Sequence, residues 1–318
     1  METAPPNERR ALVTGASGFL GRPAAEALLA HGWKVDGVRS GQPAEGASGI
    51  RWHQADLLEP AAVSRLLEET RPSHLLHLAW DVGGKGAYYA SHENDKWAAA
   101  SLHLLREFAD RGGERAVFVG TCVEYDLGQG ICDERTTPLR PDTRYGRAKL
   151  DLGERFRSFV AASDRSSGAW ARLFFLFGER ERPERLVPSV IRALLQGEPA
   201  RCSHGRQIRD FLYSADAADA LVALLDSDVE GAVNIASGEP ISVAHLVYRA
   251  AGRLGREDLV ELGAIEARPD EPPLIVADVR RLRDELGWSP RHGLDEALDR
   301  TIEWWRQHLA AETKAAGA

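Results

Sequence analysis

The segment from residue 11 to residue 32 constrains the fold of this chain more than any other. An apolar run, Ala11 to Thr14, leads directly into three spaced glycines, Gly15, Gly18 and Gly21, and a helix-forming stretch follows. This order predicts a strand, a tight turn and a helix. The free N–H groups and the partial positive charge at such a helix start attract phosphate, and glycines let a pyrophosphate approach the main chain. We therefore expect a dinucleotide-binding turn here, including Phe19 and Leu20 between the glycines.

Apolar strands and helices of about 10 to 15 residues alternate through the first half of the chain. Strands are predicted at residues 33–38, 50–55, 75–80 and 115–119, and helices at 60–70 and 97–109. This alternation indicates right-handed β-α-β units and a parallel sheet, whose ligands gather at the carboxyl ends of the strands. The sequence therefore predicts an α/β fold with a doubly wound parallel sheet, the Rossmann arrangement.

The end of the second predicted strand bears on the choice of cofactor. About 20 residues past the glycines, a dinucleotide fingerprint places an acid on the adenosine ribose. Here Arg39, followed by Ser40, occupies that place. Because an arginine can pair with a 2′-phosphate, we expect NADP(H) to be favoured over NAD(H). In the alternative, Asp36 binds the ribose hydroxyls and Arg39 is a solvated loop residue.

Two further segments follow predicted strands on the same edge of the sheet. They are Asp56-Leu57 and Leu78-Ala79. At strand ends they are expected near the adenine and ribose, although a loop cap and a core strand would explain them equally well.

Composition excludes several other classes of function. The net charge of −8 and the pI near 5.7 argue against nucleic-acid binding, which needs a basic face. The three cysteines lack metal-binding spacing, so we expect no metal site and no disulfide framework. No apolar run approaches the ~18 residues that span a bilayer, and no export signal is recognised, so a cytoplasmic location is expected.

A candidate pair for proton transfer is Tyr145 and Lys149. In a helix, residues four apart lie on one face, so the ammonium can lower the pKa of the phenol. The alternative is a half-buried tyrosine beside a solvated lysine. Thr121, at the end of the fifth predicted strand, would bring a hydroxyl to the same crevice, where it can hydrogen bond a reacting carbonyl or alcohol.

These motifs together resemble the extended short-chain dehydrogenase/reductase family, in particular its NAD-dependent epimerase/dehydratase group that modifies nucleotide sugars. The likeness covers nearly the whole chain and is carried by Gly15-x-x-Gly18-x-x-Gly21, Asp56-Leu57, His77-Leu78-Ala79, Thr121, Tyr145-x-x-x-Lys149, Arg172 to Gly178, Gly205 to Phe211, Asn234 to Gly238 and Leu286 to Pro290. The resemblance implies that Thr121 orients the sugar oxygen, Tyr145 transfers its proton, and Lys149 binds the nicotinamide ribose while lowering the tyrosine pKa.

The resemblance also implies a substrate side of the site. Val187 belongs to the nucleotide pocket, Arg209 and Arg268 hold the nucleotide diphosphate, and Phe175 takes the place of an asparagine near the substrate phosphates. For Arg209, a surface ion pair with Asp210 is the alternative. We expect residues 1–178 plus 208–236 to form the NAD(P)-binding domain. Residues 179–207 plus 237–318 are expected to form a smaller, discontinuous α+β domain for a nucleotide-diphosphate sugar.

Departures from the family pattern reduce the number of reactions that we expect. Dehydratases of this group carry an Asp-Glu pair after the threonine, and Cys122-Val123 stands there instead. Because elimination needs an acid and a base, 4,6-dehydration is not expected. Trp97 replaces a helix asparagine that is usual in the family. Cys122 is expected to pack in the interior, and Glu124 to be exposed to solvent.

Three functions follow in order of preference. The first is an NADPH-dependent 4-ketoreductase with Tyr145 as proton donor, and the second is a 4-epimerase that retains NAD. The third is a non-catalytic cofactor-sensing protein. The family also implies a homodimer formed through the helices that contain Trp97 and Tyr145.

Overall fold

A parallel seven-stranded sheet organises the larger part of the computed structural model, which describes residues 9–41, 49–83 and 86–316. Its strand order is β11-β7-β5-β4-β1-β2-β3, so the chain runs outward from β1 in both directions. The strands are β1 (Arg10–Thr14), β2 (Lys34–Arg39), β3 (Ile50–Gln54), β4 (His74–His77), β5 (Arg115–Thr121), β7 (Ser167–Leu173) and β11 (Gly231–Ile235). The predicted α/β doubly wound fold is therefore confirmed.

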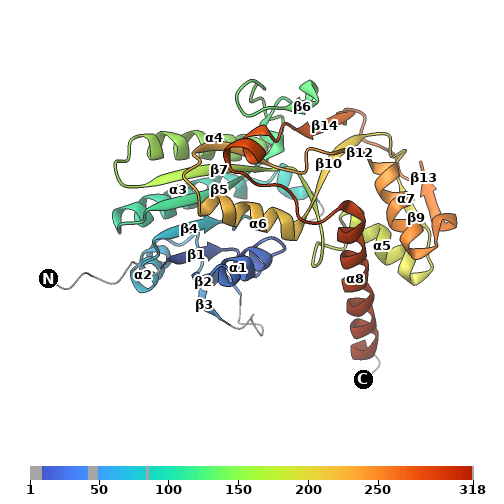
Figure 1. Ribbon diagram of the computed structural model, residues 1–318, viewed down its shortest axis with the longest axis horizontal. Coiled ribbons are helices and arrows are strands. Elements are labelled where there is room, and N and C mark those ends of the chain that lie inside the picture. Colours follow the sequence, from blue (N-terminus) through green and yellow to red (C-terminus); the bar gives the residue numbers. More distant parts are fainter. Residues whose placement is uncertain (1–8, 42–48, 84–85, 317–318) are drawn as a thin grey trace.

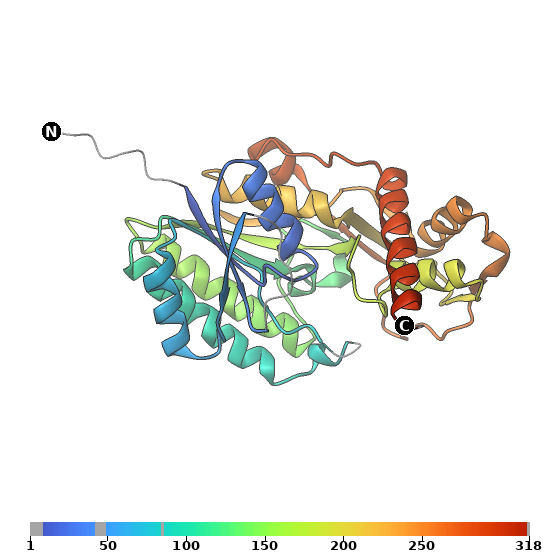
Figure 2. The same cartoon turned by 90° about the horizontal axis from the view of Figure 1, so that it is seen from below.

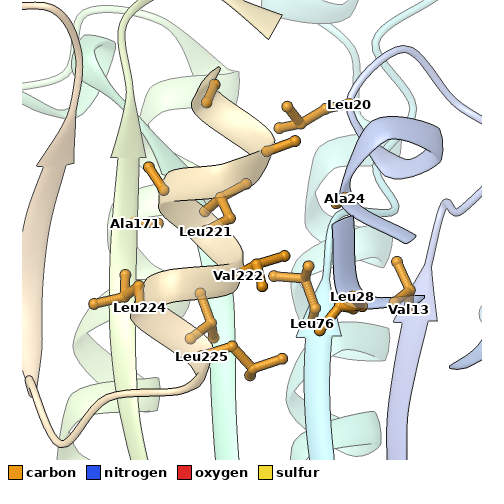
Figure 3. Packing of buried hydrophobic residues seen from close by; sticks show 14 of the residues in the cluster. Val13, Leu20, Ala24, Leu28, Leu76, Ala171, Leu221, Val222, Leu224 and Leu225 are labelled. Atoms are coloured by element: carbon orange, nitrogen blue, oxygen red, sulfur yellow. The ribbon is translucent and has the colours of Figure 1, made fainter. Parts of the chain in front are cut away.

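Helices cover both faces of this sheet (Figure 2). Helices α1 and α6 share one hydrophobic cluster with the sheet, and α2, α3 and α4 share another. In the first cluster, Val222 and Leu225 of α6 meet Leu28 of α1 and Leu76 of β4 (Figure 3). The helices are α1 (Gly21–Ala30), α2 (Pro60–Thr70), α3 (Glu93–Asp110), α4 (Arg144–Ala161) and α6 (Ser214–Leu225). Apolar burial on both faces explains why the central strands are hydrophobic throughout.

A smaller lobe, on the right of Figure 1, is built mainly from segments after β7. Its helices are α5 (Leu186–Gln196), α7 (Val243–Leu254) and α8 (Leu294–Ala316). Strands β12 (Pro240–Ser242), β10 (Ile208–Tyr213), β14 (Leu274–Ala277) and β6 (Ile131–Cys132) form a sheet, in which β8 (Phe175–Phe177) also pairs with β10. Strand β9 (Ala200–Cys202) pairs with β13 (Val260–Leu262).

Short helical turns connect these elements. They are η1 (Ala87–Tyr89), η2 (Cys122–Glu124), η3 (Leu127–Gln129), η4 (Glu257–Leu259) and η5 (Arg281–Glu285). Of these, η1 and η2 lie next to α4, and they carry side chains that surround Tyr145.

Three details differ from the sequence prediction. Strand β4 ends at His77 rather than residue 80, because the next two backbone N–H groups bind the Thr14 hydroxyl. Helix α3 begins at Glu93 rather than residue 97, with two acids in its first turn, where they suit the helix dipole. Strands β8 and β10 pair in the smaller sheet rather than in the large one. The rest of the predicted division into domains stays a prediction.

No helix in the described part of the chain is both long and apolar enough to cross a membrane. Within the same residues, His, Cys, Asp and Glu side chains form no group of three or more that could hold a metal ion.

Candidate active site

The glycine turn closes tightly between β1 and α1. Gly15 has a φ of +67°, and Gly18 N donates to Gly15 O at 2.9 Å. A Cβ on Gly21 would lie 2.0 Å from Gly15 O, so a side chain there would force the turn apart. These positions require glycine for geometric reasons, because the backbone of the turn packs directly against the first residue of α1.

The start of α1 fits a pyrophosphate. No side chain caps it among the described residues, and its first turn carries no acid. Leu20 is buried against the core and Phe19 is half-buried. Ala16 N donates to Val38 O at 3.3 Å, which places the turn beside the end of β2. The uncapped helix start and the glycine-rich turn together match what a dinucleotide phosphate needs.

The end of β2 carries a cation that forms no ion pair with the residues that the structure describes. Arg39 is the last residue of β2 and is only 9% exposed. Its guanidinium lies 5.0 Å from the centre of the Trp52 ring, and its buried Nη2 has no hydrogen-bond partner in the described structure. An orphaned guanidinium nitrogen beside the glycine turn suits an added phosphate. Next to it, Ser40 is exposed and its carbonyl accepts from Gln54.

Asp36 lies in the middle of β2 and is buried. It is bonded to His53 Nε2 at 2.7 Å and to Arg51 Nε at 2.5 Å. The alternative in which Asp36 binds ribose hydroxyls is therefore wrong in this structure, because its carboxylate is already occupied inside the sheet. Arg39 is likewise not a solvated loop residue.

The other predicted cofactor segments lie at neighbouring strand ends. Asp56 is exposed and its carboxylate accepts from Leu58 N at 2.9 Å, so it caps the turn before α2. Leu57 packs in the core. The backbone N–H groups of Leu78 and Ala79 both donate to Thr14 Oγ1 at 3.1 Å, and Ala79 lies against Gly15. The structure thus brings the residue 78–79 backbone to the glycine turn.

A chain of hydrogen bonds connects the ends of β1 and β4 to helix α3. Ser101 Oγ donates to Trp97 O at 2.7 Å, so its oxygen is left to accept from His77 Nε2 at 2.8 Å. His77 Nδ1 then accepts from Thr14 Oγ1 at 2.8 Å. Burial, reinforced by the charge of Lys149, lowers the pKa of His77 to about 3. The imidazole is therefore neutral at physiological pH, and a single tautomer satisfies every bond.

Thr121 and Tyr145 meet at the carboxyl end of β5. The Thr121 side chain lies close enough to the Tyr145 phenol to lower its pKa as a hydrogen-bond partner. Thr143 caps α4 by accepting from Gly146 N at 3.0 Å, which sets the first turn that carries Tyr145. Two hydroxyls in contact at a strand end form the donor pair that a carbonyl oxygen needs.

The predicted effect of Lys149 on the tyrosine is wrong in this structure. Burial raises the pKa of Tyr145 well above its ordinary value, whereas the Thr121 hydrogen bond acts in the opposite direction. Lys149 points elsewhere: its Nζ donates to Val119 O at 2.9 Å and lies 3.6 Å from the centre of the Trp80 ring. The alternative of a solvated lysine is also wrong, because Lys149 is 4% exposed and burial lowers its pKa to about 7.

Aromatic rings enclose the phenol. The rings of Tyr88, Tyr89 and Trp80 lie edge-on to Tyr145, with centroid distances of 5.1, 5.8 and 6.2 Å. Tyr88 and Tyr89 stack on each other at 4.3 Å. These rings reduce water access to the Tyr145 phenol, which strengthens electrostatic interactions there.

The prediction that Glu124 is exposed to solvent is also wrong, because the residue is fully buried. Its carboxylate accepts from Thr121 N at 2.8 Å, from Trp170 Nε1, and from Arg172 Nε at 2.7 Å. Arg172 in turn donates to the Tyr125 hydroxyl at 3.0 Å. Burial opposes the charge of Arg172, yet Glu124 and Tyr125 hold its pKa above the ordinary value. Cys122 is buried as predicted, and burial raises the pKa of its thiol.

Three of the four predicted substrate residues are at least partly buried, and the fourth, Arg268, is exposed. Arg209 is 3% exposed, binds Glu271 Oε1 at 2.8 Å and lies over the Phe175 ring, so the alternative of a surface pair with Asp210 is wrong. Val187 is buried in the first turn of α5. Arg268 is exposed, three residues before Glu271. The structure joins Arg209 to Phe175, and the roles of all four residues stay predictions.

Sequence reasoning missed several residues around the site. They are Thr14, Trp80, Tyr88, Tyr89 and Asn94, which are connected by hydrogen bonds and ring contacts. His77 and Arg172 stand in the quoted family motifs, but those motifs do not reveal their hydrogen bonds. Trp80 had one available signal, since an indole directly follows the cofactor segment Leu78-Ala79. The others are read only from tertiary contacts.

The chain is similar in sequence to enzymes that act on nucleotide sugars. The model of the NAD dependent epimerase/dehydratase family matches residues 11–236. A dTDP-6-deoxy-L-talose 4-dehydrogenase (NAD(P)(+)) from Kitasatospora kifunensis is 30% identical and covers 91% of this chain and 93% of its own length. A UDP-glucose 4-epimerase from Azospirillum brasilense is 25% identical and covers 97% of this chain and 95% of its own length.

Solved structures agree with these relatives. MoeE5 in complex with UDP-glucose and NAD is 29% identical with a TM-score of 0.82, covering 94% of this chain and 99% of that one. The UDP-glucose 4-epimerase of Thermus thermophilus in complex with NAD is 26% identical with a TM-score of 0.83, covering 93% and 99%. With its glycine turn, its Thr121–Tyr145 pair and these relatives, the chain belongs to the NAD-dependent epimerase/dehydratase family.

Proposed function

We propose that this enzyme reduces the C4 ketone of a nucleotide-diphosphate sugar with NADPH, with Tyr145 as proton donor. The observation that carries the proposal is the approach of the Thr121 side chain to the Tyr145 phenol at the carboxyl end of β5. Both residues lie on the sheet edge where the glycine turn also opens.

In this proposal the chain's own residues hold and protonate the ketone. The Thr121 hydroxyl and the Tyr145 phenol both donate to the carbonyl oxygen, which develops negative charge as the bond is reduced. The raised pKa of Tyr145 keeps the phenol protonated at neutral pH, as a proton donor requires. A bound nicotinamide cofactor supplies the hydride. Lys149 would bind the nicotinamide ribose.

The substrate nucleotide would lie against the smaller lobe. Arg209 and Arg268 would bind the diphosphate, with Phe175 and Val187 lining the pocket. Arg209 is already paired with Glu271, so a diphosphate would share or replace that carboxylate. A guanidinium held in place by a buried stem is suited to such binding.

The Kitasatospora relative supports the reductase, because its name describes oxidation at C4, which is ketone reduction in reverse. The UDP-glucose 4-epimerases support the second candidate, an epimerase with retained NAD. Both reactions use the same three residues, so the geometry favours oxidoreduction at C4 without selecting its net direction. A non-catalytic cofactor sensor is the third candidate, but it needs no hydroxyl pair.

A substrate panel separates these candidates. The purified protein is incubated with NADPH or NAD and with UDP- or dTDP-linked 4-keto and 4-hydroxy sugars, and nicotinamide absorbance is followed together with product identity. We expect stoichiometric loss of NADPH with 4-keto sugars. A C4 epimer formed without net cofactor change would replace the reductase by the epimerase.

Arg39 is proposed to select NADPH. Replacing it with aspartate removes a charge-assisted pair with the 2′-phosphate, so we expect Arg39→Asp to weaken NADPH binding by ~10–100-fold and NADH binding by less than about threefold. Calorimetric titration with each cofactor measures both. Arg306→Asp, at an exposed ion pair on α8, is the charge-matched control and should change neither affinity. Equal losses for both cofactors would contradict selection by Arg39.

A homodimer formed through α3 and α4, and a cytoplasmic location, also stay proposals. The first rests on the family resemblance.

A further inference from the structure

Lys149 is a buried cation with an unusual set of neighbours. Its Nζ donates to Val119 O at 2.9 Å, and the face of the Trp80 ring lies 3.6 Å away. Glu124, in η2, is the carboxylate that acts on its charge, but that carboxylate already binds Arg172 at 2.7 Å. The indole is therefore the group that directly covers the ammonium.

Trp80 is itself held by a fully satisfied asparagine. Trp80 Nε1 donates to Asn94 Oδ1 at 2.8 Å, while Asn94 Nδ2 donates to Tyr88 O at 2.6 Å and Ser91 O at 2.9 Å. Because an indole N–H can only donate and a carbonyl can only accept, the orientation of the Asn94 amide is unambiguous. Asn94 is 2% exposed, so these bonds are not shared with bulk water.

The same indole also contacts the proton donor. The Trp80 ring lies edge-on to Tyr145 at 6.2 Å and packs near Trp97 at 6.2 Å. One side chain thus touches both members of the Tyr145–Lys149 pair, which do not contact each other through a hydrogen bond in the described structure.

We propose that Trp80 is a positioning residue that holds Lys149 in its charged form and in place through a cation–π contact, with Asn94 fixing the indole. The π face of an indole attracts a cation most strongly when the pair is shielded from water. The indole therefore substitutes for a counter-ion beside the residue expected to bind the nicotinamide ribose. The positioning stands on the geometry alone, whereas its value for cofactor binding rests on the proposed function.

The surroundings identify Lys149 as the group that titrates near neutrality. Burial lowers its pKa to about 7, opposed by the charge of Glu124. His77, facing it from β4, is neutral because its pKa is lowered to about 3, and Tyr145 on the same helix has a raised pKa. A lost cation–π contact would lower the Lys149 pKa further, so the ammonium would lose its proton at a lower pH.

Lysine 13Cε NMR of the protein without cofactor tests this directly, because the chain contains only five lysines and Lys149→Arg assigns the signal. We expect Trp80→Leu to lower the Lys149 pKa by ~0.5–1 unit, about three- to tenfold in the protonation equilibrium. Trp80→Phe keeps an aromatic face, so the Lys149 pKa should stay close to its value in the unaltered protein. Trp97→Leu removes an indole from the same cluster but not from the ammonium, and it should leave the pKa unchanged.

Two further measurements keep the test independent of activity. In the unaltered protein, ring-current shielding should move the Lys149 Hε signals upfield of the other lysines, which needs no variant to fold. Titration with NADPH should show weaker binding in Trp80→Leu at pH 8 and near-equal binding at pH 6. An unchanged Lys149 pKa in Trp80→Leu, or unshifted Hε signals, would overturn the positioning. A lowered pKa with unchanged NADPH affinity would support it and instead remove Lys149 from the proposed ribose site.

Discussion

Replacing Tyr145 with phenylalanine is expected to lower kcat for ketone reduction by ~10²–10⁴-fold, the usual value of a positioned proton donor. The substitution removes one hydroxyl and keeps the ring that packs against Tyr88 and Trp80. NADPH affinity should change by less than about threefold, because the ring contacts and Lys149 remain in place. Stopped-flow turnover at saturating substrate and calorimetric cofactor titration measure the two effects separately.

Tyr89→Phe is the matched control for this result. Tyr89 is a neighbouring phenol whose ring lies 5.8 Å from Tyr145, but Thr121 bonds Tyr145 instead. We expect Tyr89→Phe to retain kcat within about tenfold. If Tyr145→Phe kept full turnover while remaining folded, proton transfer by Tyr145 would be excluded, and another group would have to supply the proton.

Glu124→Gln is expected to have the largest effect on stability. The glutamine keeps the shape of the side chain but leaves the buried charge of Arg172 without its partner. Breaking one side of a buried ion pair costs roughly 3–5 kcal/mol in the free energy of unfolding. Urea unfolding followed by circular dichroism should show a lower midpoint with little change in slope.

Glu303→Gln gives the comparison on the surface. Glu303 pairs with Arg306 on α8, where both side chains are half exposed. Exposed pairs of this kind contribute about 0–1 kcal/mol, so the midpoint should hardly move. Equal losses in the two variants would show that the network around Glu124 contributes nothing beyond a surface pair. A folded Glu124→Gln protein should also lose activity, since Glu124 holds the backbone N–H of Thr121.

Local patterns were enough to predict most of the larger lobe. The strand, turn and helix of residues 10–30 lie where the glycine spacing predicts them, and α2 has the predicted bounds. These features depend on nearest neighbours and on short-range sterics, which a linear sequence states directly. The end of β4 at His77 could not be predicted in this way, because Thr14, which lies 64 residues before Leu78, supplies the competing hydrogen-bond acceptor.

The amino-acid sequence by itself determined the doubly wound sheet, the glycine turn between β1 and α1, and the identity of Thr121, Tyr145 and Lys149 as the candidate chemical groups. Only the tertiary structure decided how those groups are controlled. From the sequence, Glu124 is an ordinary polar residue, whereas in the structure it binds Arg172. The sequence pairs Lys149 with Tyr145, whereas in the structure its ammonium contacts Trp80 and Val119 O. The physical reason is that burial and long-range pairing set charge and pKa, and neither is contained in the spacing of residues along the chain.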